Sequence, residues 1–125
     1  MSPPGLSEVS FAELEKLATG PCVPCEGINS FSPEDVANAL TQLPGWSFRE
    51  NSIEKEFHFP SYSAGLDFAR RIGKEAESQN HHPDLIIRWR RVKVIWTTHT
   101  IHGISQNDIV MAARTELDAR RNMPQ

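Results

Sequence analysis

Two runs of β-branched and aromatic residues in the second half of the chain predict a β-hairpin. The runs cover residues 85–89 and 92–98, and two arginines at 90–91 separate them. If the turn is centred on these arginines, residues that face each other have numbers that sum to 181. This register gathers apolar residues on one face by pairing Leu85 with Trp96, Ile87 with Val94 and Trp89 with Val92. It also places His82 opposite His99, with Cβ atoms roughly 5 Å apart.

Three other segments carry apolar residues at the spacing of amphipathic helices. The first follows an N-cap at Ser32, the second runs from residue 62 to about 77, and the third follows Ser105 as N-cap, with Asp108 three residues on. Their apolar faces consist of Val36, Ala37, Leu40 and Leu43; of Tyr62, Leu66, Ala69, Ile72, Gly73 and Ala76; and of Ile109, Ala112, Ala113 and Leu117.

Between the first two helices, residues 46–48 and 53–59 alternate between apolar and polar side chains, which predicts two strands joined across 50–52. The elements then predict an α+β fold: a four-stranded, mainly antiparallel sheet with three helices packed on one face. Such a sheet has two open edges, and we expect a homo-oligomer to close one of them. Ile86 and Ile95, which the same register pairs on the second face of the hairpin, would otherwise be exposed.

The sequence predicts an N-terminal arm over residues 1–30 and a single domain over residues 31–121. A capping box at residues 10–13 indicates one short helix in the arm, before a Pro/Gly-rich loop with the CxxC pair Cys22 and Cys25. Two cysteines supply half the ligands of a structural zinc site. Prolines beside them and the lack of a preceding strand disfavour a thioredoxin-like site. A loop without chemistry is the first interpretation, ahead of a metal or disulfide staple and of redox work.

Composition restricts the classes of function. A chain of 125 residues fits one domain, which buries roughly two thirds of its unfolded surface. Sixteen acidic and thirteen basic residues give a net charge of −3, without the basic excess of a nucleic-acid-binding surface. No apolar run approaches the roughly 20 residues of a membrane span, and no secretory signal is recognisable. We therefore expect a cytoplasmic protein that binds neither nucleic acid directly nor a membrane.

Three histidines, His81, His82 and His99, fall within nineteen residues, and the hairpin brings them closer. Histidine gives or takes a proton near pH 7 at little cost, which suits acid–base catalysis. Side chains of neighbours in an extended chain face opposite ways, although Pro83 favours a bend after the first two. Structural roles and a three-histidine zinc site are the alternatives, and adjacent ligands fit tetrahedral zinc poorly. The helix dipole alone could explain Asp108.

Several motifs together resemble the pterin-4a-carbinolamine dehydratases, particularly the bacterial type. They are Pro44-Gly45-Trp46, Glu77-x3-His81-His82-Pro83, Trp89-x2-Val92-x-Val94, Thr98-His99, Gly103, Asp108 and Met111-Ala112-Ala113. The match runs from about residue 43 to 117, and the double histidine before proline with a downstream Thr-His is its most specific part. The resemblance implies a small α+β subunit that assembles as a homodimer or homotetramer.

The resemblance also implies a hydro-lyase that dehydrates 4a-hydroxytetrahydropterin to quinonoid dihydropterin and water, in the recycling of tetrahydrobiopterin. It implies no metal and no organic cofactor. By similarity, His82 is the main acid–base residue, and His81 and His99 bind the pterin and stabilise or exchange the second proton. Glu77 has a supporting role. The implied pterin contacts are Asn80, His81, His82, Pro83, Thr97, Thr98, His99, Thr100 and Asp108.

Two positions depart from the family pattern. Asn80 stands where some members carry an acid, and Ser78 where they carry a lysine. An acid before the histidines could raise their basicity, so its loss could lower the rate. Other members of this fold act as binding partners, a transcriptional coactivator and a Rubisco assembly factor among them. A non-catalytic interaction module is therefore the alternative, although retention of all three histidines favours the enzyme.

Overall fold

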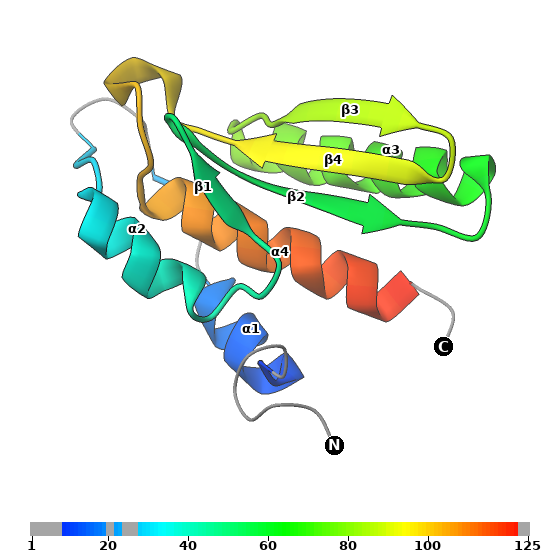
Figure 1. Cartoon of the computed structure of the whole chain (residues 1–125), viewed down its shortest axis with the longest axis horizontal. Coiled ribbons are helices and arrows are strands. Elements are labelled where there is room, and N and C mark those ends of the chain that lie inside the picture. Colours follow the sequence, from blue (N-terminus) through cyan, green and yellow to red (C-terminus); the bar gives the residue numbers. More distant parts are fainter. Residues whose placement is uncertain (1–8, 20–21, 24–27, 123–125) are drawn as a thin grey trace.

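The computed structural model describes residues 9–19, 22–23 and 28–122, which form one four-stranded sheet with helices against it (Figure 1). The predicted α+β fold is thereby confirmed. The elements are α1 (Phe11–Leu17), α2 (Pro33–Leu40), β1 (Ser47–Arg49), β2 (Ser52–His58), α3 (Tyr62–Gln79), β3 (Asp84–Arg88), β4 (Arg91–Trp96), the short 3₁₀ helix η1 (His99–Ile101) and α4 (Gln106–Asn122). All strand pairs are antiparallel, in the order β1-β2-β4-β3. The fourth α-helix, α1, is the short helix expected in the arm.

The core lies between the sheet and the helices α3 and α4. Alternate residues of β4 are buried against these helices, namely Val92, Val94 and Trp96. The intervening residues of β4 point to the other face of the sheet, because side chains alternate along a strand. On that face Lys93 lies 3.9 Å from Glu54, and Arg91 lies 3.7 Å from Glu56. One apolar face and one charged face are typical of an antiparallel sheet that is covered on one side.

The predicted register of the β3–β4 hairpin is wrong by two residues. Asp84 faces Ile95 and Leu85 faces Val94, so opposed residues sum to 179. The turn consists of Trp89 and Arg90, and Arg90 adopts a left-handed conformation with φ +62°. The backbone of Arg90 accepts a hydrogen bond from Phe59 N–H (2.9 Å), which holds the turn against the end of β2.

This shift changes the partners but not the faces, because side chains repeat every two residues along a strand. Leu85 and Ile87 remain on the side of the helices, as predicted. Trp89, by contrast, lies in the turn and is 71% exposed. The ladder therefore does not pair His82 with His99. These histidines lie beyond its last pairs at the same end of the hairpin, where β3 begins and β4 ends.

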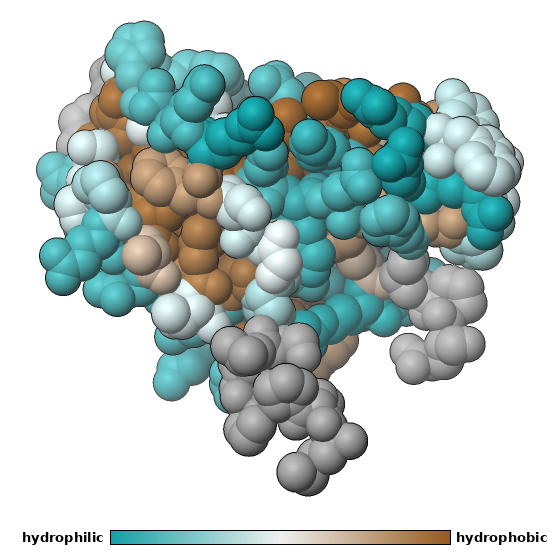
Figure 2. Space-filling model, viewed as in Figure 1, coloured by the Kyte–Doolittle hydropathy of each residue, from teal (hydrophilic) through white to brown (hydrophobic). Residues whose placement is uncertain are grey.

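β3 is an open edge of the sheet with apolar residues on both of its faces. Ile86 is 39% exposed and Ile87 is 41% exposed. Figure 2 shows apolar surface along the top of the view, over β3. Ile86 faces Lys93 and Ile95 faces Asp84, so the expected Ile86–Ile95 pair does not form. No helix in the described ranges combines the length and apolar character that crossing a membrane requires.

Candidate active site at the end of the hairpin

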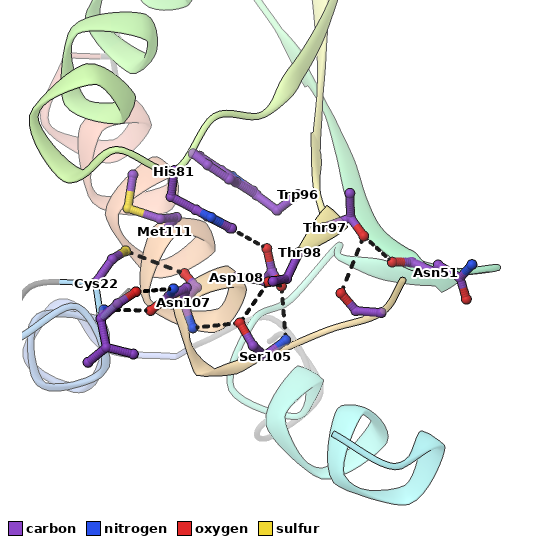
Figure 3. Close-up of polar contacts among 12 residues, drawn as sticks. Cys22, Asn51, His81, Trp96, Thr97, Thr98, Ser105, Asn107, Asp108 and Met111 are labelled. Atoms are coloured by element: carbon purple, nitrogen blue, oxygen red, sulfur yellow. Dashed lines mark hydrogen bonds and ion pairs between the residues drawn. The ribbon is translucent and has the colours of Figure 1, made fainter. Parts of the chain in front are cut away.

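The chain reverses sharply between α3 and the double histidine. Asn80 ends α3 in a left-handed conformation (φ +52°), and its N–H bonds to carbonyl oxygens of the last helical turn. The next N–H, that of His81, donates to the Ala76 carbonyl (3.2 Å). This reversal turns the His81 side chain into the protein, where it is 5% exposed and its ring stacks on Trp96 at 5.6 Å between ring centroids (Figure 3).

Asp108 is fully buried in the first turn of α4 and binds His81. Its Oδ1 accepts a hydrogen bond from His81 Nε2 at 2.7 Å. Its Oδ2 accepts bonds from the Ser105 N–H (2.9 Å) and from the Thr98 hydroxyl (2.7 Å). An acidic side chain in the first turn of a helix also interacts favourably with the helix dipole. Asp108 thus accepts the Ser105 N–H at the start of α4 with one oxygen and orients a buried imidazole with the other.

Thr98 connects this carboxylate to the loop that carries His99. The Thr98 hydroxyl also lies 2.7 Å from the Ser105 hydroxyl, so three polar side chains meet inside the protein. The backbone of Thr98 bonds to that of Gly103 in both directions, at 2.8 and 3.4 Å, which closes a loop. His99 begins the single turn of η1 in this loop, and His102 ends it in a left-handed conformation.

His82 lies in a different environment from its neighbour. Its Nε2 is 3.0 Å from Glu77 Oε1, and the side chains are 51% and 79% exposed. Solvent screens such a pair, so it adds little to stability. The contact does hold the imidazole at the surface, beside the last turn of α3. His81 and His82 therefore bind separate carboxylates, one buried and one exposed.

His99 lines a shallow depression of about 210 Å³ next to the start of β3. Thr97 is held there by hydrogen bonds from its hydroxyl to the carbonyl oxygens of Asn51 and Gly103. The depression is lined by Glu50, Asn51, Ser52, Asp84, Ile95, Thr97, His99 and His102. Two of the expected contact residues, Thr97 and His99, thus lie on its wall.

The expected site residues fall into three groups in the structure. His81, Thr98 and Asp108 form the buried network; His82 and Glu77 form the exposed pair; and Thr97 and His99 line the depression. The remaining three are Asn80 at the end of α3, the half-buried Pro83 and the exposed Thr100 on η1.

Sequence reasoning missed several residues around this site. Ser105 was expected only as an N-cap, and Trp96 only as a core residue. Asp84 and His102 were given no role, although Asp84 directly follows the double histidine and proline, and His102 lies three residues after His99. The hairpin register and the Thr98–Gly103 loop bring Asp84 and His102 to the depression, and neither feature follows from the local sequence pattern.

A larger hollow of about 520 Å³ lies between α1, α3 and α4 and contains none of the histidines. Its charged groups are paired with one another: Arg71 with Asp118, Arg114 with Glu75 and Arg121 with Glu15. Burial raises the pKa of the Asp118 carboxyl, against the lowering effect of the Arg71 guanidinium. We therefore place the candidate site at the end of the hairpin that carries the histidines. Its depression is smaller, but it lies beside side chains that can transfer protons. In the described part of the chain, no group of three His, Cys, Asp or Glu residues is arranged to hold a metal ion.

Comparisons with known proteins agree on one family. Residues 29–117 match the family model described as pterin 4 alpha carbinolamine dehydratase. Several relatives carry the name "Putative pterin-4-alpha-carbinolamine dehydratase", and two of them show the extent of the similarity. That of Chlorobaculum tepidum is 40% identical over 100 residues (76% of this chain, 90% of the relative), and that of Rubrobacter xylanophilus is 37% identical over 105 residues (82% and 98%). The crystal structure of a transcriptional coactivator/pterin dehydratase from Brucella melitensis superposes with a TM-score of 0.70 at 29% identity, covering 73% of this chain and 99% of that one.

Proposed function

The chain belongs to the pterin 4 alpha carbinolamine dehydratase family, and on that premise we propose that it dehydrates 4a-hydroxytetrahydropterin to quinonoid dihydropterin and water. The reaction would serve the recycling of tetrahydrobiopterin. Family membership supports the substrate class. The observation that carries the proposal is a pair of adjacent imidazoles in contrasting surroundings, His81 buried on Asp108 and His82 at the surface on Glu77.

The reaction needs two proton transfers at one planar ring. A proton must reach the departing C4a hydroxyl, and another must leave a ring nitrogen as the C=N bond forms. An acid and a base therefore have to lie on the substrate at the same time. Histidines supply both functions near neutral pH.

We assign the main acid–base role to His82. Its half-exposed imidazole can exchange protons with water between turnovers, and Glu77 at 3.0 Å holds its orientation. His81 is less suited to free exchange, because its ring is stacked on Trp96 and its Nε2–H is directed to Asp108. In line with the family resemblance we assign to His81 the binding and polarisation of the pterin, through the small part of its surface that stays exposed.

His99 is the third participant in the proposal. It projects from a loop that two backbone hydrogen bonds close, and it lines the depression together with Thr97 and Asp84. We assign to it pterin binding and the second proton.

Stopped-flow measurement of the dehydration of synthetic 4a-carbinolamine tests the proposal. The wild-type protein should accelerate the reaction well above its spontaneous rate, and an oxidised pterin analogue should raise its melting temperature. A rate equal to the spontaneous one would reject the enzyme and leave a non-catalytic interaction module as the better account of the fold.

A further inference from the structure

The N-terminal arm is attached to the residues that flank the buried His81–Asp108 pair. The Cys22 N–H donates to the side-chain oxygen of Gln79 (2.9 Å), which is the last residue of α3 and two positions before His81. The next arm residue, Val23, bonds to Asn107, the neighbour of Asp108 in α4. One dipeptide of the arm therefore spans the end of α3 and the start of α4.

The contact between Asn107 and the arm is made through the main chain of Val23. The Val23 N–H donates to Asn107 Oδ1 (2.9 Å), and Asn107 Nδ2 donates to the Val23 carbonyl (2.8 Å). A carboxamide presents one acceptor and one donor side by side, and so matches the N–H and C=O of a single residue. Asn107 is 2% exposed, whereas Val23 is 52% exposed, so backbone pairing more than side-chain burial holds this segment.

Hydrogen bonds continue from Asn107 to the imidazole (Figure 3). The Asn107 N–H donates to the Ser105 hydroxyl (3.3 Å), and that hydroxyl lies 2.7 Å from the hydroxyl of Thr98. Thr98 donates to Asp108, and Asp108 accepts the Nε2–H of His81. The arm and the buried imidazole are therefore the two ends of one continuous polar network.

We infer that Asn107 is a positioning residue of the site: by fastening the Cys22–Val23 segment across the ends of α3 and α4, it holds Asp108, and through Asp108 the ring of His81. The rate effect that follows rests on the proposed dehydratase function. The effect on the geometry of His81 does not.

The arm has other contacts with α4 that lie away from this network. Arg114 Nε donates to the Ala18 carbonyl (3.2 Å), and Arg120 donates to the Val9 carbonyl (2.6 Å). Leu14 of α1 is fully buried. These contacts hold the arm on α4 without touching the residues around His81. A variant that removes one of them therefore shows what a weaker attachment of the arm does by itself.

The test compares Asn107→Ala with Arg120→Ala in the full-length protein. Asn107→Ala should lower the kcat of dehydration by on the order of tenfold, less than the roughly 10²-fold that a misplacement of about 1 Å can cost. It should also shift the ¹⁵N resonances of the His81 ring and alter their pH titration. Arg120→Ala removes one arm contact at the far end of α4, together with the ion pair of Arg120 with Glu116 (3.8 Å). It should leave kcat within about twofold and the His81 resonances unchanged.

A second variant, Gln79→Ala, keeps the inference testable if Asn107→Ala does not fold. Gln79 is only partly buried at the end of α3, and Gln79→Ala removes the acceptor of the Cys22 N–H without opening the core. It should shift the His81 resonances in the same sense. Unchanged resonances in both variants would overturn the inference, as would equal shifts in Arg120→Ala. A wild-type protein that does not dehydrate the carbinolamine would reject the proposed function but leave this resonance comparison valid.

Discussion

Asp108 uses its two carboxylate oxygens for different purposes, because Oδ2 caps α4 and accepts from Thr98 while Oδ1 binds His81. An amide cannot accept from three donors, so Asp108→Asn should lower the free energy of unfolding by about 1–3 kcal/mol. Urea denaturation measures this loss. The exposed Asp67 of α3 offers a matched control, since Asp67→Asn should change stability by less than about 0.5 kcal/mol. Equal effects at the two positions would contradict the role given to the buried carboxylate.

The division of labour among the histidines is the second prediction at this scale. His82→Ala should slow dehydration by on the order of 10²–10⁴, the usual contribution of a general acid–base group. Replacing His81 or His99 by alanine should slow dehydration less than His82→Ala does, and should also weaken pterin binding. The double change of His82 and His99 should be less damaging than the product of the single changes, because groups that act together are not additive. Stopped-flow rates with separate binding measurements would refute this division if His81→Ala proved the most damaging to the rate.

Sequence motifs single out His81, His82 and Asp108 as candidate site residues, but they do not indicate which carboxylate each histidine binds. That choice depends on Asn80, whose left-handed conformation turns one ring inward and leaves the other outside. Hydrophobic periodicity contains no information about such a turn. Asn is one of the residues that tolerate it, so a helix C-cap at Asn80 could have been predicted.

At the scale of elements, the sequence predicted the α-helices and strands of the described residues in the right order but not the short helix η1. The pattern is clearest where one face is buried, as in β2 and β4, whereas β1 is exposed along its length. It did not predict the hairpin register, because both candidate turns leave the same residues on the apolar face. The turn at Trp89 and Arg90 is stabilised by the contact of Arg90 with Phe59, a residue 31 positions earlier. Contacts of this range are not visible in a local pattern.

The positive φ of Arg90 makes the turn testable. Arg90→Gly and Arg90→Val both remove the guanidinium, including its bond to the Phe59 carbonyl and its stacking on Trp89. Glycine adopts a left-handed conformation freely, whereas a β-branched residue does not. Arg90→Val should therefore be less stable than Arg90→Gly by about 1–2 kcal/mol in urea denaturation. Equal stabilities would show that this turn is not strained.

The cysteines of the arm are expected to be dispensable for chemistry. Cys22 bonds to Gln79 through its backbone N–H, and its sulfur lies 4.0 Å from the Asn107 carbonyl, at the limit of a weak contact. Cys25 lies outside the described residues. Replacing both by serine should leave turnover within about twofold, because the backbone of the arm is retained. A loss of more than tenfold without unfolding, or stoichiometric zinc in the purified protein, would contradict this expectation.

At the scale of the whole molecule, β3 is the edge that we expect to be covered by a second copy of the chain. Its Ile86 and Ile87 are each about two fifths exposed, and among the described residues no strand lies beside its outer backbone groups. Light scattering at micromolar concentration should give at least twice the 14.1 kDa of one chain. Ile86→Lys should shift the mass toward one chain. A wild-type mass of 14.1 kDa would contradict the prediction.

The loop closed by Thr98 and Gly103 has a consequence for engineering. Its two backbone hydrogen bonds fix both ends, and the four residues between them lie outside the buried core. A library that varies Thr100 and Ile101, keeps His99 and limits the left-handed His102 to residues that tolerate a positive φ would therefore change the wall of the depression at position 102 while the scaffold stays intact. Variants selected from such a library should differ in substrate range but express at similar levels. Substrate recognition by this loop could then change without loss of the fold.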